Sequence, residues 1–559
     1  MLVKQREINQ PLKKLLIDDG IDQHLASILA ARNIGSIAEI HYDLKNLIPP
    51  NRLYSLEATA AFLHQCIKKQ KKILIIGDYD ADGATATAVA VLGLRKFLAN
   101  VDFLVPNRFE YGYGLTIGIV KEALKKTPDV IITVDNGIAS IEGVQFARDN
   151  NIDVIVTDHH LPADQIPNAN FIVNPNQKNC SFSSKSLCGV GVVFYLLMAL
   201  RAVFREANEF IEIQEPNLFD LIDLVCLGTV ADLVPLDFNN RILVHHGMKK
   251  IKRNSCNFGI QAIAKLSNKS LSHLKTSDIS FSIAPKLNAA GRLDDMSIGI
   301  KCLLSQSLQE AEVFAIELIK LNSQRKEIEV EMQEDALKHI VFDEEKNYSI
   351  CLFDESWHQG VIGILASRIK EKYFRPTIIF AKDANGILKG SGRSIPGFHL
   401  RDALDFISKK HSDLIITFGG HAMASGLTID EVNFELFIKV FNAHCANVIS
   451  KDDLNLVVDV DESILTMNAT FDDIFKIDMS IWGQGFSPPS FTDEFTLVSQ
   501  KTLMNKHTKC QLSLNGKVYE AIFFNFSETL PDKIKAIYSI EANEFRGSKK
   551  IQLILRDLI

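Results

Sequence analysis

Apolar runs alternate with helical stretches between residues 72 and 173. The runs are KILIIG, VDFLVP, DVIITV and IDVIVT, and the stretches between them include ATATAVAVLGLRKFL and IEGVQFARDNN. Short apolar runs separated by helices are typical of buried strands that pair in parallel, with helices on both faces of the sheet. The pattern therefore predicts an α/β fold built on a doubly wound parallel sheet.

The sequence pattern changes several times along the rest of the chain. Residues 307–340 keep helical periodicity without any Gly or Pro, which predicts a long connecting helix. A second α/β pattern starts near Tyr348, and β-rich segments after Asn455 predict a small barrel, for which the oligonucleotide-binding (OB) fold is one common form. We therefore expect an N-terminal helical segment (1–50), a catalytic α/β domain (51–250), a helical connector (251–345), a second α/β domain (346–450) and a C-terminal OB-like barrel (451–559).

Composition narrows the class of protein. The hydrophobic share of 47% and the charged share of 23% are those of ordinary globular proteins. The N-terminal residues lack the apolar core of a secretory signal, the most apolar run (189–200) is too short to span a membrane, and the nine cysteines form no CxxC pair. We therefore expect a cytoplasmic protein without membrane contact. Because the net charge is −7, any nucleic-acid binding must come from a local groove.

Acidic residues and histidines directly follow several of the apolar runs. They are Asp78, Asp80 and Asp82 after the first run, Asp135 after the third, and Asp158, His159 and His160 after the fourth. In an open parallel sheet, ligands bind beyond the carboxyl ends of the strands, so these side chains are expected to converge. Asp232, in the segment GTVADLVPL, is a further candidate.

This combination of side chains favours divalent metal ions. Carboxylates with one or two imidazoles suit Mn²⁺ or Mg²⁺ better than zinc held by thiolates. Two such ions, ~4 Å apart, activate a water and stabilise an in-line phosphoryl displacement. The spacing Asp-x-Asp-x-Asp-Gly also begins a calcium-binding loop, but Val89 stands where that loop needs Glu. Hydrolysis of a phosphoester is therefore the expected chemistry.

Taken together, these segments resemble the signature of the DHH phosphoesterase family. The matching segments, in order, are GDYDADGATATAV, VDNG, TDHH and GTVADLVPL. The resemblance implies that the metal ligands are Asp78, Asp80, Asp135, His159 and Asp232, with Asp135 bridging two ions. It places His160 against the scissile phosphate, and it leaves Asp82 and Asp158 open between ligands and groups that orient their neighbours.

Two further segments, NRFEYGYGL (107–115) and NAAGRL (288–293), resemble one branch of that family, the single-strand-specific DNA exonucleases. WHQGVIGILASRI (357–369), GSGRS (390–394) and GGHAMASG (419–426) resemble the DHH-associated domain, which handles the substrate. The resemblance implies that substrate is bound by Arg108, Arg292, Ser391, Arg393 and His421. It covers the chain from about residue 50 to the end and departs from the branch at WGQGFSPP (482–489), where a Phe-Gly-x-Gly-Asn stretch is usual.

The branch implies a function. The resemblance implies that the chain hydrolyses single-stranded DNA from 5′ to 3′ with two Mn²⁺ or Mg²⁺ ions and releases mononucleotides. It also implies a role in recombination and repair, with a single-stranded-DNA-binding protein and a helicase as partners. A DHH phosphoesterase for small substrates and a non-catalytic scaffold are the alternatives; the residues beyond Asn455 favour a polymer substrate, and the complete set of candidate ligands disfavours a scaffold.

Two sets of candidate substrate-binding residues have an alternative interpretation. The candidate substrate-binding arginines would alternatively form salt bridges between domains. Phe523, Phe524 and Tyr538 either stack on bases or fill the core of the barrel.

Overall fold

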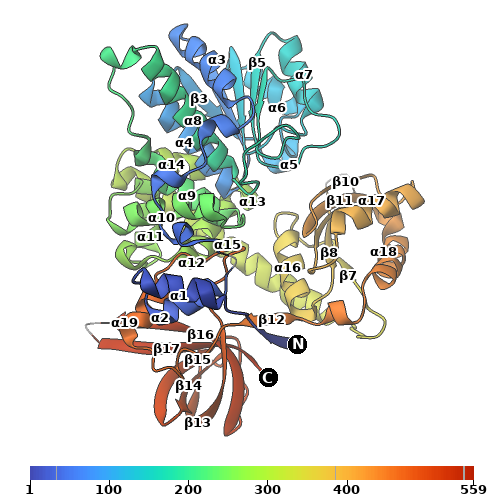
Figure 1. Ribbon diagram of the computed structural model, residues 1–559. Coiled ribbons are helices and arrows are strands. Elements are labelled where there is room, and N and C mark those ends of the chain that lie inside the picture. The colour runs from blue at the N-terminus through green and yellow to red at the C-terminus, as the bar shows by residue number, and fades with distance from the viewer. Residues whose placement is uncertain (33, 384–385, 546–547) are drawn as a thin grey trace. The chain divides into compact units, whose positions relative to one another are not determined.

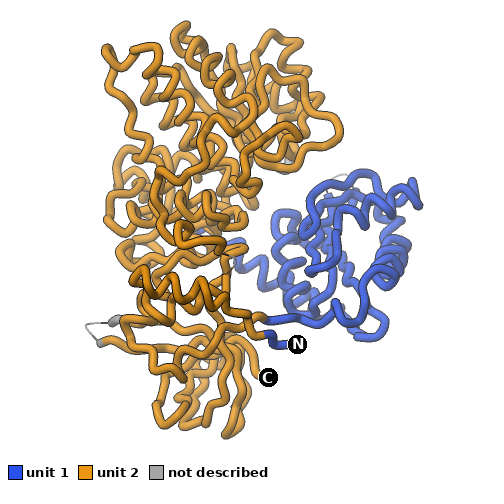
Figure 2. The backbone as a smooth tube through the Cα atoms, in the orientation of Figure 1, with its two compact units in different colours: residues 1–4, 320–458 blue, residues 5–319, 459–559 orange. Residues whose placement is uncertain are grey.

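The computed structural model describes residues 1–32, 34–383, 386–545 and 548–559 (Figure 1). The chain divides into two compact units, shown in Figure 2. Unit 1 comprises residues 1–4 and 320–458, and unit 2 comprises residues 5–319 and 459–559. Most of unit 1 is therefore inserted, in sequence, between two parts of unit 2.

Unit 2 contains a parallel sheet with the strand order β3-β2-β4-β5-β6. Its strands are β2 (Ile73–Gly77), β3 (Val101–Leu104), β4 (Val130–Val134), β5 (Asp153–Thr157) and β6 (Phe171–Val173). The helices around it are α3 (Leu56–Lys68), α4 (Ala81–Lys96), α5 (Arg108–Tyr111), α6 (Ile117–Leu124), α7 (Ile141–Asp149) and α8 (Gly189–Glu206).

Helices cover both faces of this sheet. Ile119 of α6 and Val144 of α7 pack with Leu74 and Ile131 of the strands, and Figure 1 places α3, α4 and α8 on the opposite side. The predicted doubly wound parallel sheet is confirmed. Helix α8 contains the apolar run that begins at Gly189, and most of its residues are buried. Among the residues described, no helix is both long enough and apolar enough to cross a membrane.

Further helices follow the sheet in unit 2. They are α9 (Ile222–Ala231), α10 (Phe238–Lys252), α11 (Phe258–Leu266), α12 (Thr276–Asp278), α13 (Ala284–Leu293) and α14 (Ser297–Leu304). Helix α15 (Leu308–His339) begins in unit 2 and ends in unit 1. It is the long connecting helix that the sequence predicts.

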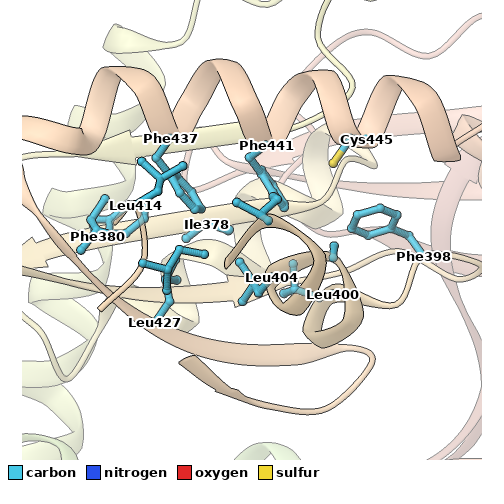
Figure 3. Packing of buried hydrophobic residues seen from close by; sticks show 14 of the residues in the cluster. Ile378, Phe380, Phe398, Leu400, Leu404, Leu414, Leu427, Phe437, Phe441 and Cys445 are labelled. Carbon is cyan, nitrogen blue, oxygen red and sulfur yellow. The ribbon is translucent and has the colours of Figure 1, made fainter. Parts of the chain in front are cut away.

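Unit 1 is the second α/β domain, and its sheet has the strand order β10-β11-β9-β8-β7. Its elements are β7 (Ile350–Phe353), α16 (Ile362–Tyr373), β8 (Thr377–Lys382), β9 (Ile387–Arg393), α17 (Leu400–Lys410), β10 (Thr417–Gly420), β11 (Ala424–Asp430) and α18 (Phe434–Val448). Strands β7 and β8 pair in parallel. The pairs β8–β9, β9–β11 and β11–β10 are antiparallel. Figure 3 shows the core, in which Phe437 and Phe441 of α18 pack over Leu404 of α17 and Ile378 of β8.

The C-terminal strands of unit 2 form a closed barrel in the order β13-β14-β15-β17-β16, which confirms the predicted barrel. They are β13 (Phe491–Leu503), β14 (His507–Leu514), β15 (Lys517–Phe523), β16 (Lys533–Phe545) and β17 (Ser548–Leu558), preceded by α19 (Phe471–Asp478). Phe523 and Tyr538 are buried in the barrel, whereas Phe524 is 52% exposed. Of these aromatic residues, Phe524 is thus the one with a face open to solvent.

The N-terminal helices α1 (Gln10–Asp18) and α2 (Gln23–Ala30) also belong to unit 2. Arg32 follows α2, and its guanidinium donates to Asp461 Oδ1 at 2.5 Å and to Asp461 Oδ2 at 3.0 Å. Both side chains are buried. Strand β1 (Leu2–Gln5) pairs with β12 (Val457–Val460). The beginning of the chain is therefore fastened to the residues around 457–461, which lie about a hundred residues before its end.

Candidate metal centre

Three of the candidate ligands stand immediately after parallel strands. Asp78 follows β2, Asp135 follows β4 and Asp158 follows β5. The register places the last residues of these strands beside one another, so the strands end at one edge of the sheet. All three aspartates are buried, with at most 6% of their surface exposed. The topology therefore brings together carboxylates that lie up to 80 residues apart in the chain.

The side chains form overlapping groups with the geometry of metal sites. Within each group, the candidate ligand atoms lie within 4.8 Å of one another: Asp78, Asp80 and Asp135; Asp82, His159 and Asp232; Asp135, His159 and His160. His159 Nε2 lies 3.1 Å from Asp135 Oδ1 and 3.6 Å from Asp232 Oδ2. Asp135 and His159 therefore join the groups into one cluster.

Burial and mutual repulsion make this cluster electrostatically unfavourable without cations. Burial raises the pKa of Asp135 and of Asp232 well above the usual range, and the neighbouring carboxylates raise both further. Burial and the charge of Asp80 raise the pKa of Asp82 to about 7. Divalent cations would relieve this repulsion. Carboxylate oxygens with imidazole nitrogens are also the donors that Mn²⁺ accepts, so the residues fit such ions.

Asp158 orients the residues that follow it. Its Oδ1 accepts hydrogen bonds from the backbone amides of His159 and His160 at 2.7 and 3.1 Å, and its Oδ2 accepts from the amide of Ile138 at 2.9 Å. His160 Nδ1 lies 2.7 Å from Asp158 Oδ1. Burial alone would lower the pKa of His160, but the bond to Asp158 raises it to about 9. The carboxylate therefore holds the His160 ring in one orientation.

Tyr113 is a neighbour of His160 that the sequence analysis did not single out. Its hydroxyl lies 3.2 Å from His160 Nδ1 and 3.5 Å from the carbonyl oxygen of Asp135. The available signal was its place inside the segment NRFEYGYGL. The segment thus brings at least one side chain to the cluster.

Asp80 and Asp82 also serve as caps of helices. Asp80 Oδ1 accepts from the amide of Gly83 at 3.0 Å, at the start of α4. Asp82 accepts from the amides of Gly189 and Val190 at 2.6 and 3.0 Å, at the start of α8. Gly189 was missed in the sequence, although a Cβ there would lie 2.5 Å from Asp135 Cβ. Asp82 is therefore fixed by amides of α8 while it borders the cluster.

The segment NAAGRL lies in α13 and packs against the first acidic turn. Asn288 Oδ1 accepts from the amide of Ala81 at 2.8 Å. A Cβ on Gly291 would meet the carbonyl oxygen of Tyr79 at 1.8 Å, so this close approach requires glycine. Arg292 follows on the same helix and is half-buried. Helix α13 thus supports the turn that carries Asp78 and Asp80.

The other candidate substrate residues belong to unit 1, apart from Arg108. Ser391 and Arg393 lie on β9, and Arg393 Nη1 donates to Ser391 Oγ at 3.2 Å and to the Gly392 carbonyl at 2.8 Å. Burial lowers the pKa of Arg393, and no carboxylate in the described part of the chain forms an ion pair with it. His421 lies in the turn between β10 and β11, where its amide donates to the Ala424 carbonyl at 2.8 Å. The side chain of Arg108 lies outside the described residues.

Comparisons with family models agree with this architecture. The N-terminal domain of the DHH family matches residues 72–229, which contain the strand-end aspartates. The DHHA1 domain matches residues 345–447, and the RecJ OB domain matches residues 460–557. The fold and the acidic cluster therefore define a protein of the DHH family.

Comparison with known proteins identifies the branch of the DHH family to which the chain belongs. The chain is 44% identical to the single-stranded-DNA-specific exonuclease RecJ of Haemophilus influenzae, over 99% of this chain and 98% of the relative. Identity to the Escherichia coli RecJ is 43%, over 96% of this chain and 95% of the relative. The crystal structure of Thermus thermophilus RecJ in complex with Mn²⁺ matches with a TM-score of 0.82 and 26% identity, covering 100% of this chain and 79% of that one. The chain belongs to the RecJ family of exonucleases.

Proposed function

We propose that this protein is a single-strand-specific DNA exonuclease that acts from 5′ to 3′ and releases mononucleotides in DNA recombination and repair. The observation that carries the proposal is the cluster around Asp135 and His159, whose ligand groups share these two residues, in a chain of the RecJ family. Its cofactors are two divalent ions, Mn²⁺ or Mg²⁺.

The proposed ligands are Asp78, Asp80, Asp135, His159 and Asp232. When bound, the metals would supply an activated water and positive charge for the phosphate oxygens. Asp135 belongs to two of the ligand groups, which supports its role as the bridge. Asp82, held by two amides of α8, would keep the surrounding backbone in place.

Asp158 and His160 would act on the substrate side of the centre. Asp158 holds Nδ1 of His160, and the Tyr113 hydroxyl lies 3.4 Å from Nε2, so the ring is held in place beside the acidic cluster. An imidazole fixed in this way loses little freedom when it binds. We assign His160 to the scissile phosphate and Asp158 to the orientation of His160.

Other residues would bind the DNA strand. Arg393 and Ser391 are proposed to hold the 5′-terminal phosphate, because Arg393 is half-buried and has no carboxylate partner among the described residues. Arg108, Arg292 and His421 would contact other parts of the strand. In this proposal residues 51–250 catalyse, residues 251–345 connect, residues 346–450 bind substrate, and the barrel region (451–559) binds the strand, with Phe524 exposed for base stacking.

The setting follows from the substrate. We assign the protein to the cytoplasm, where single-stranded DNA arises during repair. A single-stranded-DNA-binding protein and a recombination helicase are its proposed partners, since they expose and present such strands.

Single-stranded DNA labelled at either end tests the proposal, with Mn²⁺ or with EDTA. Early release of the 5′ label as a mononucleotide, gradual shortening of the 3′-labelled strand and complete inhibition by EDTA are expected. Survival of the DNA alongside hydrolysis of short oligonucleotides or cyclic dinucleotides would indicate a small-substrate phosphoesterase. Absence of all hydrolysis would indicate a scaffold.

A further inference from the structure

The segment Trp482–Phe486, here called the WGQGF turn, lies in unit 2 between α19 and the barrel. The turn closes on itself: the Gly483 amide donates to the Phe486 carbonyl at 2.9 Å, and the Phe486 amide donates to the Gly483 carbonyl at 3.1 Å. The rings of Trp482 and Phe486 stack with centroids 5.4 Å apart. Both rings are buried. The turn is therefore a rigid and well-packed element.

This turn docks onto the loop that follows Asp232. The Leu236 amide donates to the Gln484 carbonyl at 2.7 Å. A Cβ on Gly483 would lie 2.7 Å from Leu236 Cδ1, so glycine is what lets the two segments approach. The contact begins only four residues after Asp232, which ties the barrel junction to a candidate metal ligand.

Arg241 of α10 also binds the loop that follows Asp232. Its Nη1 donates to the Leu236 carbonyl at 3.0 Å, and its Nη2 donates to Glu39 Oε2 at 2.8 Å. The guanidinium carbon lies 4.5 Å from the centroid of the Phe486 ring. Both the amide and the carbonyl of Leu236 are thus bonded: the amide to the turn, and the carbonyl to Arg241, whose guanidinium lies over Phe486 of the turn.

The turn is itself anchored on two sides. Arg32 Nε donates to the Ser487 carbonyl at 3.0 Å, and its guanidinium carbon lies 5.4 Å from the centroid of the Trp482 ring. Thr276 Oγ1 donates to the Trp482 carbonyl at 2.6 Å. The N-terminal segment and the helices before α13 therefore hold the turn in place.

Asp232 is positioned by a different kind of element from the strand-end ligands. Asp78 and Asp135 follow strands of a buried sheet, whereas Asp232 caps the end of α9. The next residue, Leu233, has φ 58°, a left-handed conformation that is unfavourable for leucine and persists only where the surroundings hold it. The Asp232 amide donates to the Gly228 carbonyl of α9 at 2.9 Å, so it is the loop after Asp232 that depends on contacts outside the helix.

We propose that the WGQGF turn is a positioning element of the metal centre: it holds the loop 233–236 and thereby sets the place of the Asp232 carboxylate beside His159. The proposal rests on the proposed function, because it concerns the same metals. It also links the barrel junction physically to catalysis. DNA cleavage and metal binding would then depend on residues of the turn that contact neither the DNA nor the metal ions.

Gly483→Ala tests this link, since its methyl group would displace Leu236. We expect Mn²⁺ affinity, measured by isothermal titration calorimetry on the full chain, to fall about tenfold, as for other groups that orient ligands. The KM for single-stranded DNA should stay within about twofold. The double variant Gly483→Ala/Leu236→Ala makes room for the methyl group and should recover most of the affinity.

A barrel variant separates positioning from general damage. Leu512→Ala removes a fully buried side chain of β14 and should lower the melting temperature without changing Mn²⁺ affinity. Unchanged Mn²⁺ binding in Gly483→Ala, no recovery in the double variant, or an equal loss in Leu512→Ala would each overturn the proposal. Phe486→Leu, which removes the ring beside Arg241, gives the same comparison if Gly483→Ala does not fold. A wild-type chain that binds Mn²⁺ but cleaves no DNA would refute the proposed function alone.

Discussion

The two open five-stranded sheets carry polar residues in opposite ways. In unit 2, buried aspartates stand beyond the carboxyl ends of parallel strands, and the central strands β2 and β4 are mostly apolar. In unit 1, Ser391 and Arg393 lie within strand β9, on one face of a mostly antiparallel sheet. Negative charge therefore collects at an edge in one unit, and positive charge lies along a strand in the other.

The difference teaches how each topology builds a site. Parallel strands bring together the residues that follow each strand, so Asp78 and Asp135 meet although they are far apart in sequence. Antiparallel pairing instead sets residues opposite one another by register: Ser391 faces Gly426 and Arg393 faces Ala424. Both side chains pack close to Gly363 of α16, where a Cβ would lie 3.0 Å from Ser391 Oγ and 3.1 Å from Arg393 Nη2.

The largest effect is expected at the acidic edge. Asp135→Ala removes a candidate ligand from two groups, so exonuclease activity should fall by about 10³-fold, the upper range for loss of one electrostatic partner. Release of 5′-labelled nucleotide in Mn²⁺ measures it. Asp129→Ala, at the amino end of the same strand, is the matched control and should retain activity. Equal losses in both variants would show that the two ends of the sheet do not differ in function.

A second change tests the positive strand. Arg393→Ala should raise the KM for 5′-phosphorylated single strands by about 10- to 100-fold, because a charge-assisted hydrogen bond is lost. The KM for strands with a 5′-hydroxyl should change less. Lys382→Ala on β8 is the control, since that cation is already paired with Glu355 and Glu431. If both substrates lose affinity equally in Arg393→Ala, the arginine does not read the terminal phosphate.

Asp158→Asn sharpens the distinction between a ligand and an orienting group. Loss of the charge that fixes His160 should lower kcat about tenfold and leave Mn²⁺ affinity unchanged. Steady-state kinetics and calorimetric titration separate these quantities. A large loss of Mn²⁺ affinity would instead make Asp158 a ligand.

The smallest effect on activity is expected from the core of unit 1. Leu404→Ala opens a cavity in the cluster of Figure 3 and should lower the free energy of unfolding of that unit by about 2–5 kcal/mol. Well below the unfolding transition, activity should stay within about twofold of wild type. Leu436→Ala, at a half-exposed position, should change neither quantity appreciably. A strong loss of Mn²⁺ binding in Leu404→Ala would mean that the two cores are coupled.

Periodicity and strand-end chemistry predict much of this molecule. Each of the apolar runs between 72 and 157 became a strand, and the aspartates that follow them converge. Asp232 was a candidate because it follows the apolar segment LIDLVCL, but that segment forms helix α9 and not a strand, so the strand-end argument could not place it. Gly189 was missed because a contact across the fold leaves no local pattern, whereas Tyr113 was not singled out within the segment NRFEYGYGL. Alternation in AIFFNF could not tell buried Phe523 from exposed Phe524, since the closure of the barrel decides which side faces inward.

The ion pair between Arg32 and Asp461 affects the order in which the chain can fold during its synthesis. The two residues are 429 positions apart, so the N-terminal helices remain without this partner on the ribosome until Asp461 has emerged. The same holds for Leu236, whose partner Gln484 is translated late. Unit 1, by contrast, is almost continuous and is free to fold as soon as residue 458 has left the exit tunnel. Unit 2 is completed only by residues 459–559, so the WGQGF turn and the barrel emerge after the last residue of unit 1.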